Sequence, residues 1–313
     1  MELYRGLHNT PKMVDGCVAT IGNFDGVHLG HQKMISALKH NADRLGLPAI
    51  VIVFEPQPLE YFLQKKAPAR LCRLRDKVYF LASQKIDAIL SLPFNHHLAN
   101  LSPQNFVETV LFQHLKVKHL IVGEDFQFGK NRQGNFPLLK RLGEENNCVV
   151  DALPTVSQGN ERISSTRIRQ VLEQGDLGCV EQLLGRPFSM FGRVAHGDKR
   201  ARQWGIPTAN IYLHRLVSPL QGVYCINAVI DGEIHEGVAN VGTRPTVDGT
   251  KSLLEVHLLN FNRDIYAKNI EVRFMHKLRD EQRFDNVEAL KQQILADVAN
   301  CAAFFQSHFH CVE

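Results

Sequence analysis

The sequence has no apolar run long enough to cross a membrane and no leader-like pattern at its start. No stretch approaches the roughly 20 uninterrupted apolar residues that span a bilayer. Residues 1–6 lack the charged segment followed by an apolar segment that marks a signal peptide. We therefore expect a cytoplasmic protein with no membrane partner.

Paired cysteines and a strong charge of one sign are also missing. The 7 cysteines form no CxxC pair and none lies near another at zinc-ligand spacing, so we expect reduced thiols, several of them buried. A net charge of +4 suits anionic small molecules but is too small to indicate a nucleic-acid partner. No internal repeat or low-complexity tract occurs. With 313 residues, 44% of them hydrophobic, the chain can form two domains with a core each.

The most informative stretch is Gly22–His31, with the sequence GNFDGVHLGH. Apolar, β-prone residues precede it and apolar residues at helical spacing follow it, which predicts a strand, a turn and a helix. Gly22 and Gly26 permit a sharp turn and a close approach to a ligand. His28 and His31 stand three residues apart, so we expect both on one face of the first helical turn, beside its free N–H groups. The pattern predicts a phosphate site, although isolated histidines near a helix start are often only solvated.

Further apolar runs at 49–54, 88–92, 119–123 and 148–150 predict buried strands, with helical patterns between them. Strands that alternate with helices predict a doubly wound, mostly parallel sheet. In such a sheet, ligands bind beyond the carboxyl ends of the strands, at a switch point.

Two further segments of this half contain candidate ligand-binding residues. The glycine-bounded loop 123–130 follows a strand, and a surface loop with one aromatic residue turned inward explains it nearly as well. In the segment 164–167, Ser-Ser-Thr-Arg, hydroxyl groups and N–H donors open a helix, and the arginine offers a planar fork for phosphate. An ordinary serine cap with solvated arginines explains that segment equally well in isolation. Because the segment occurs together with the histidine motif, we favour phosphate binding.

The pattern changes after the Gly-Arg-Pro segment 185–187, which predicts a first domain of residues 1–184 and a second of residues 185–313. Short strands follow, with Asp231-Gly232 as a hairpin turn, and a final helix begins near Asn286. Strands without intervening helices, closed by one terminal helix, predict a small antiparallel barrel. The expected fold is therefore an α/β domain followed by a β domain.

A second candidate site lies in this second half. A strand ends in a glycine-bearing, basic loop, residues 192–205, that can surround phosphates, and Thr208 and Asn210 follow. In an extended segment these two side chains share a face, and their oxygen atoms suit a Mg²⁺ ion that bridges phosphates. On physical grounds alone, a charged loop before an edge strand is the slightly better explanation. Glu255, flanked by apolar residues, is either a general base or an outward, solvated residue, and the sequence leaves both open.

The motifs GNFDGVHLGH, VGEDFQFG, ISSTRIR, GIPTAN and LLEVHL, in this order and spacing, closely resemble those of the bifunctional prokaryotic riboflavin kinase/FMN adenylyltransferases, or FAD synthetases. The resemblance covers essentially the whole chain, and the first motif resembles the phosphate-binding signature of the HxGH nucleotidyltransferases. It implies two ATP-dependent steps that require Mg²⁺. The C-terminal half would phosphorylate riboflavin to FMN, and the N-terminal half would join AMP to FMN and release pyrophosphate.

The resemblance also implies roles for individual residues. In the first half, His28, His31 and Arg167 would stabilise charge on the transferred phosphate group. In the second half, Glu255 would be the base that activates the ribityl 5′-hydroxyl group. In the first half, the other implied contacts are with ATP at Gly22, Asn23, Asp25, Gly26, Ser164 and Thr166, and with flavin at Asp125 and Phe128. In the second half, they are with ATP at Gly192, His196 and Gly197, and with Mg-ATP at Thr208 and Asn210. Flavin contacts of the second half are implied at Asn240 and Arg244.

The chain departs from the family pattern at three positions: Ala201 stands where glycine is common, Trp204 where leucine is common, and Gln57 where histidine is common. If the family glycine has a positive φ, alanine adds strain of roughly 1–2 kcal/mol and slows the kinase step. The alternatives are therefore an adenylyltransferase with an impaired kinase half and a non-catalytic flavin-binding regulator. A tRNA-directed enzyme is a further alternative, because class I aminoacyl-tRNA synthetases share HxGH, but no KMSKS-like segment occurs.

Overall fold

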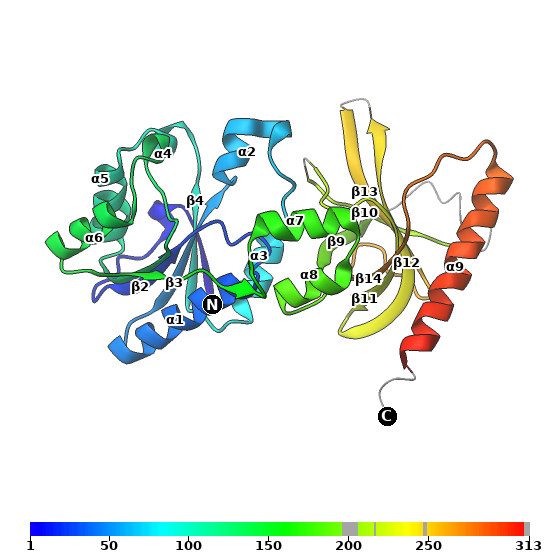
Figure 1. The fold of residues 1–313 in the computed structure, drawn as a ribbon, viewed down its shortest axis with the longest axis horizontal. Helices are drawn as coiled ribbons and strands as arrows, with labels where there is room; N and C mark the ends of the chain where they lie inside the picture. Colours follow the sequence, from blue (N-terminus) through cyan, green and yellow to red (C-terminus); the bar gives the residue numbers. More distant parts are fainter. Residues whose placement is uncertain (196–205, 216, 247–248, 310–313) are drawn as a thin grey trace. The chain divides into compact units, whose positions relative to one another are not determined.

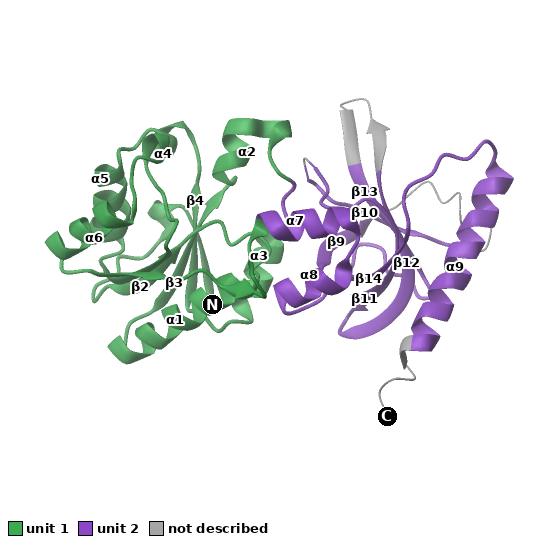
Figure 2. Cartoon of the chain, viewed as in Figure 1, with its two compact units in different colours: residues 1–68, 72–165 green, residues 69–71, 166–313 purple. Residues whose placement is uncertain are grey.

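The computed structural model describes residues 1–195, 206–215, 217–246 and 249–309. The chain divides into two compact units, the first formed by residues 1–68 and 72–165 and the second by residues 69–71 and 166 onward (Figure 2). Among the helices of the described residues, none is both long and apolar enough to cross a membrane.

The first unit is built on a six-stranded sheet in which all neighbouring strands run parallel (Figure 1). Its strand order is β1-β4-β3-β2-β5-β6, with bounds β1 (Glu2–Arg5), β2 (Cys17–Ile21), β3 (Ala49–Glu55), β4 (Ala88–Pro93), β5 (Val117–Gly123) and β6 (Val149–Leu153). The sheet confirms the predicted doubly wound architecture. The strand order reverses between β2 and β5, so a ligand site is expected beyond their carboxyl ends.

Helices cover both faces of this sheet. Apolar residues of β2, β3 and β4 pack against α5, the following π-helix and α6 on one face. On the other face α1 packs against β2, β3 and β5, with Ile35, Leu38 and Ala42 buried. The helices are α1 (Leu29–Leu45), α2 (Pro58–Leu63), α3 (Leu74–Ala82), α4 (His96–Ala99), α5 (Pro103–Phe106), the π-helix Val107–His114 and α6 (Phe136–Glu145), with 3₁₀ turns at Leu7–Asn9, Gln64–Lys66 and Lys130–Arg132.

A short antiparallel pair, β7 (Ser157–Gln158) and β8 (Glu161–Arg162), leads out of the first unit. Helix α7 (Ser165–Gln174) follows and, apart from Ser165, belongs to the second unit, as does α8 (Leu177–Leu184).

The second unit contains a closed antiparallel barrel with the strand order β10-β13-β12-β11-β14-β9. Its strands are β9 (Ser189–Ala195), β10 (Ala209–Tyr212), β11 (Gly222–Ile230), β12 (Glu233–Thr246), β13 (Gly249–Leu258) and β14 (Asn269–Arg279). The predicted hairpin turn joins β11 to β12, and both of its residues have positive φ, 52° at Asp231 and 88° at Gly232. The barrel confirms the predicted fold of this half.

The terminal helix α9 (Val287–Phe309) packs on the barrel through Cys301 and Phe305, which join a cluster with Val223, Cys225 and Val238. Asn286 caps the start of this helix, because its side chain accepts the Ala289 N–H at 2.8 Å. Asparagine is a preferred residue for this role.

Candidate functional site

The motif Gly22–His31 forms the connection between β2 and α1 at the switch point of the sheet. The turn is tight, with positive φ at Phe24 (47°), Gly26 (84°) and Val27 (44°). A β-branched residue in that region is strained, and such strain concentrates at functional sites. The free N–H groups of α1 therefore open directly beyond the end of β2, as anion binding requires.

His28 and His31 lie together, but in a different arrangement from the one expected. His28 is not in the first helical turn: its backbone is extended (φ −72°, ψ 172°), and it caps α1 by accepting the His31 N–H at Nδ1, 3.3 Å away. The two rings stack with centroids 3.6 Å apart and an angle of 18° between their planes. Because Nδ1 of His28 accepts this hydrogen bond, the N–H that the ring can donate lies on Nε2.

Burial sets the charge of this histidine pair. Desolvation is the main cause that holds the pKa of His31 well below its usual range, and the charges of His28 and Lys77 lower it further. His31 is therefore neutral near pH 7 and acts as a hydrogen-bond donor and acceptor, not as a cation.

Asp25 is buried beneath the turn, where its carboxylate accepts the backbone N–H of Cys72 at 3.1 Å. The N–H of Gly26 donates to the Cys72 sulfur at 3.1 Å. Burial, followed by the charge of Asp25, raises the pKa of Cys72 to about 12, so the sulfur is a neutral thiol. These contacts hold the turn in place. The predicted contact of Asp25 with ATP stays a prediction, as do those of Gly22, Asn23 and Gly26.

Of the two other predicted segments in this half of the chain, the one that contains Ser165 contacts this turn. Ser165 Oγ donates to the backbone oxygen of Asp25 at 2.8 Å. A Cβ atom placed on Gly30 would lie 3.8 Å from the backbone oxygen of Ile163, which precedes Ser164. Asp125, in the loop after β5, pairs with Arg162 at 2.7 Å.

Phe128 is buried in the core of the first unit and lies 5.5 Å from Phe126 and 6.1 Å from Phe106, between ring centroids. Its predicted flavin contact stays a prediction beside this packing role. Thr166 and Arg167 fall in the second unit, so their pairing with the histidine corner also stays a prediction.

Sequence reasoning missed an aromatic cluster beyond the carboxyl ends of β3 and β4. Ring centroids of Tyr61 lie 5.1 Å from Phe62 and 5.4 Å from Phe94, and Phe54 lies 5.7 Å from Phe94. Phe62 is 62% exposed, which leaves its face open to a planar ligand. Gln57, one of the three departures, is the N-cap of α2, and its N–H donates to the Glu60 carboxylate at 3.1 Å.

In the second unit, strand register brings three predicted residues into one row. Asn210 lies opposite Glu255, and Glu255 lies opposite Asn240, on β10, β13 and β12. Residues directly opposite each other point to the same face of a sheet. The next residue of the row, Val223, packs against α9, so the row lies on the outer face of the barrel. Glu255 is partly exposed there, and its role as a general base stays a prediction.

Glu281, between β14 and α9, reaches the same face and was not predicted. A Cβ atom on Gly242 would lie 2.1 Å from its Oε1 and 3.5 Å from Nδ2 of Asn240. Burial raises the pKa of Glu281 above its usual value and the charge of Glu255 raises it further, whereas Arg279 lowers it. The row and Glu281 together place two carboxylates and two amide groups on this face.

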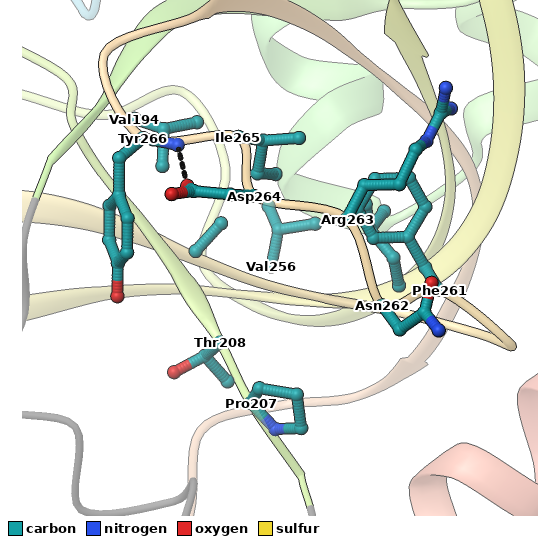
Figure 3. A pocket seen from close by; sticks show the side chains of 12 residues that line it. Val194, Pro207, Thr208, Val256, Phe261, Asn262, Arg263, Asp264, Ile265 and Tyr266 are labelled. Carbon is teal, nitrogen blue, oxygen red and sulfur yellow. Dashed lines mark hydrogen bonds between the residues drawn. The ribbon is translucent and has the colours of Figure 1, made fainter.

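A pocket of about 400 Å³ opens beside Thr208, as Figure 3 shows. Barrel residues such as Val194 and Val256 form one part of its lining, and the segment Phe261–Tyr266 forms another. Thr208 at the pocket is two residues before Asn210, and Asn210 on β10 lies opposite Glu255. The pocket and the row that contains Glu255 are therefore close along the chain. An aromatic and aliphatic lining with a few polar groups suits the base of a nucleotide.

Other predicted residues of the second half have a packing role or lie elsewhere. Gly192 is on β9, and a Cβ atom there would lie 2.0 Å from Cγ2 of Ile211, so packing across the barrel requires the glycine. Arg244 lies on β12 opposite Lys251. His196, Gly197, Ala201 and Trp204 lie outside the described residues.

A Mg²⁺ site fits the residues present. Within the described part of the chain no group of three or more histidine, cysteine or acidic residues could hold a metal ion. Mg²⁺ bound together with a nucleotide needs fewer protein ligands, because phosphates and water fill the other positions. The Thr208 hydroxyl at the pocket and the buried amide of Asn210 are suitable oxygen ligands.

Comparisons with known proteins identify the family. The FAD synthetase family model matches residues 10–167, and the riboflavin kinase family model matches residues 184–305. The bifunctional riboflavin kinase/FMN adenylyltransferase of Haemophilus influenzae is 48% identical over 308 residues, which cover 98% of this chain and 100% of that protein. The chain belongs to the bifunctional riboflavin kinase/FMN adenylyltransferase family. The protein of this name from Escherichia coli is 47% identical over 307 residues, covering 97% of this chain and 98% of its own length.

Membership of the bifunctional riboflavin kinase/FMN adenylyltransferase family confirms the resemblance that the five motifs indicated. The chain carries both a FAD synthetase domain and a riboflavin kinase domain. A crystal structure of a macrolide-efflux protein from Streptococcus pneumoniae is also similar, with a TM-score of 0.78 and 28% identity, covering 94% of this chain and 97% of that chain.

Proposed function

We propose that this chain converts riboflavin to FMN in its second half and FMN to FAD in its first, with ATP as the substrate of both steps. The observation that supports the proposal is that each matched family interval contains its own cluster of predicted site residues: the stacked histidines in one, and the row Asn210–Glu255–Asn240 in the other. We place the boundary between the halves after Leu184, where α8 ends at Gly185 in a left-handed cap.

In the kinase step, the carboxylate of Glu255 accepts the proton of the ribityl 5′-hydroxyl group as that oxygen attacks the γ-phosphorus of ATP. The bond between this phosphorus and the β,γ-bridging oxygen breaks, and ADP leaves. Asn240 and Asn210 flank Glu255 and orient the hydroxyl group and the phosphates. The adenine base occupies the pocket beside Thr208, with Phe261 and Tyr266 in its lining.

Thr208 and Asn210 would hold Mg²⁺ together with the phosphates of ATP. When bound, the ion offsets charge on the phosphate oxygens during transfer. We assign the proton transfer to Glu255, because it is the only carboxylate in the described row of opposed residues on β10, β13 and β12.

In the adenylyltransferase step, a phosphate oxygen of FMN attacks the α-phosphorus of ATP in line, and pyrophosphate leaves. No covalent intermediate with the protein forms. His28 and neutral His31, with the N–H groups that open α1, donate hydrogen bonds to the phosphate oxygens. Ser164, Thr166 and Arg167 bind the remaining phosphates. The aromatic cluster around Phe62 supplies a stacking surface for the isoalloxazine ring.

The test is incubation of the purified protein with riboflavin, ATP and Mg²⁺, followed by chromatographic separation of FMN and FAD. We expect both products. Glu255→Ala should abolish FMN formation and leave FAD formation from supplied FMN, whereas His28→Ala should do the reverse. Loss of both activities in either folded variant contradicts the assignment of two separate sites.

The same assay separates the alternatives. FAD formed only from supplied FMN indicates an impaired kinase half, the outcome that Ala201 raised. The absence of any flavin product indicates a flavin-binding regulator. Binding of labelled tRNA below micromolar concentration at physiological salt would favour a tRNA-directed enzyme.

A further inference from the structure

One wall of the pocket beside Thr208 is irregular backbone. The wall is the segment Phe261–Tyr266, which lies between β13 and β14 and is part of no helix or strand. Backbone hydrogen bonds tie it to the barrel at its two ends: Leu259 N–H donates to an oxygen of β12 at 2.8 Å, and Ala267 N–H donates to an oxygen of β9 at 2.9 Å. Between these ends the position of the wall depends on side-chain contacts, because strand pairing does not fix it.

Arg263 makes such contacts with the start of β12. Its Nη2 atom donates to the carboxylate of Glu233 and, at 2.8 Å, to Nε2 of His235. A guanidinium group can only donate, so His235 accepts at Nε2, and the N–H that its ring can donate lies on Nδ1. Strand β12 is part of the closed barrel. Through Arg263 the wall is therefore bonded to a regular element of the fold.

The same contacts hold Phe261, the aromatic ring at the start of the wall. The guanidinium of Arg263 lies 5.1 Å from the centroid of this ring, and the ring of His235 meets it edge-on, with centroids 4.9 Å apart. Both arrangements are favourable. Figure 3 shows Arg263 beside Phe261, with its guanidinium end pointing away from Thr208. Phe261 is thus held by Arg263 and by a residue of β12.

Stability of the fold does not account for this group of side chains. Arg263 and Glu233 are 51% and 59% exposed, and an exposed ion pair contributes little to the free energy of unfolding. The effect of the contacts is therefore local. They restrict a wall that has no strand or helix of its own, at a place where a ligand would lie against it.

We propose that Arg263 is a positioning residue of the kinase half, which holds the wall against β12 in the conformation that encloses the base of ATP. The inference rests on the proposed binding of the adenine base in the pocket beside Thr208. Arg263 acts through Phe261 and the backbone of the wall and contacts no reacting atom. Without it the conformation that binds the base is less populated, so the apparent affinity for ATP falls in proportion.

The test uses the full-length protein and measures riboflavin phosphorylation as the sum of FMN and FAD formed. Arg263→Met keeps an unbranched side chain and removes both hydrogen bonds. We expect the KM for ATP to rise about threefold to tenfold. The kcat and the KM for riboflavin should stay within about twofold of wild type, because the lost contact acts on ground state and transition state alike. FAD formation from supplied FMN should keep its KM for ATP, and the melting temperature should change little.

Glu233→Ala separates a positioning arginine from one that binds phosphate directly. Glu233 is a described residue that does not line the pocket. Its removal loosens the wall, so the KM for ATP should rise about threefold. If Arg263 instead contacted the phosphates, loss of the competing carboxylate would leave the KM for ATP unchanged or lower it. Such a result overturns the inference. The same variant decides the question if Arg263→Met does not fold.

Lys268→Met is the matched control. Lys268 also pairs with an acidic residue of the β11–β12 hairpin, Asp231, and it follows the wall by two residues without lining the pocket. Its removal should leave the KM for ATP unchanged. An equal rise in Lys268→Met, or a wild-type KM for ATP in Arg263→Met, overturns the inference. If the wild-type protein forms no FMN from riboflavin, the proposed function is contradicted instead.

Discussion

The imidazole ring of His28 lies directly against Gly30, two residues further along the motif. A Cβ atom placed on Gly30 would lie 3.1 Å from both Nδ1 and Cε1 of that ring. The ring has little room to move away, because it stacks on His31 at 3.6 Å and its Nδ1 accepts the His31 N–H at 3.3 Å. The glycine of the motif is therefore needed for the position of the histidine ring.

We expect Gly30→Ala to lower the kcat/KM for FAD formation from FMN about tenfold, because a small displacement of a group that binds the transferred phosphate is costly. The fold should not suffer, since alanine inside a helix is more stable than glycine by about 0.5–1 kcal/mol. Steady-state kinetics and thermal unfolding measure the two effects. Riboflavin phosphorylation by the same sample is the internal control. Unchanged FAD formation would show that this contact does not position His28.

The exposed ring of Phe62 leads to a prediction about flavin binding in the first half. Phe62→Ala removes a stacking surface, and loss of an aromatic stacking partner costs about 1–3 kcal/mol, so the KM for FMN should rise about tenfold or more. The KM for ATP in the same reaction should change little. Kinetics with each substrate varied in turn provide the measurement.

Tyr79→Ala is the matched control, because Tyr79 is an aromatic residue of α3 that is 53% exposed. It should leave the KM for FMN unchanged. Equal effects of the two variants would mean that Phe62 has no special role in flavin binding.

Glu281 leads to a prediction about pH. Burial, then Glu255, raises its pKa in the folded protein, so the folded state keeps a proton that the unfolded state releases just above the usual value of 4.5. Its contribution to stability is thus favourable at low pH and is lost as pH rises through the folded-state pKa. Glu281→Gln should therefore gain stability relative to wild type as pH is raised from about 4.5 to 7. Denaturant midpoints across this range measure the difference.

Glu288→Gln provides a control of opposite sign. Glu288 lies in the first turn of α9, where a negative charge interacts favourably with the helix dipole. Removal of that charge should lower the free energy of unfolding at pH 7. If both variants show the same trend, the Glu281 carboxylate is not disfavoured by its surroundings.

Hydrophobic periodicity and turn residues were sufficient to predict most of the fold. Buried strands such as β3 are continuous apolar runs, and the Asp231-Gly232 turn alone predicts the β11–β12 hairpin. Strand β1 was not predicted, because it has four residues with charged, exposed ends and pairs only with β4. His28 was placed inside the helix, since spacing alone does not distinguish an N-cap from the first helical turn.

The supporting residues of both sites could not be predicted, for two physical reasons. Glu281 lies in a segment whose local pattern is that of a polar loop, and only tertiary packing brings it against β12. The aromatic cluster joins residues from β3, α2 and the segment after β4, which no single sequence window contains. Motifs predict the groups that touch substrates, whereas the residues that orient these groups depend on three-dimensional contacts.

Strain at an alanine was predicted at Ala201, which lies outside the described residues, but the described backbone contains such an alanine elsewhere. Ala267 has φ of 63° directly after the segment that lines the pocket beside Thr208. Its N–H donates to Val194 and its oxygen accepts from Arg193, both at 2.9 Å, so the backbone is held in this conformation.

Ala267→Gly should therefore stabilise the protein. The left-handed conformation costs an alanine about 1–2 kcal/mol, and the greater freedom of glycine in the unfolded chain offsets about 0.5–1 kcal/mol of the gain. The expected net increase in the free energy of unfolding is about 0.5–1 kcal/mol, measured by denaturant unfolding. Asn260→Gly is the control, because Asn260 has a similar φ of 50° but asparagine tolerates it. A gain at residue 260 equal to that at 267 would show that alanine carries no special strain, because the two substitutions relax the unfolded chain to a similar degree.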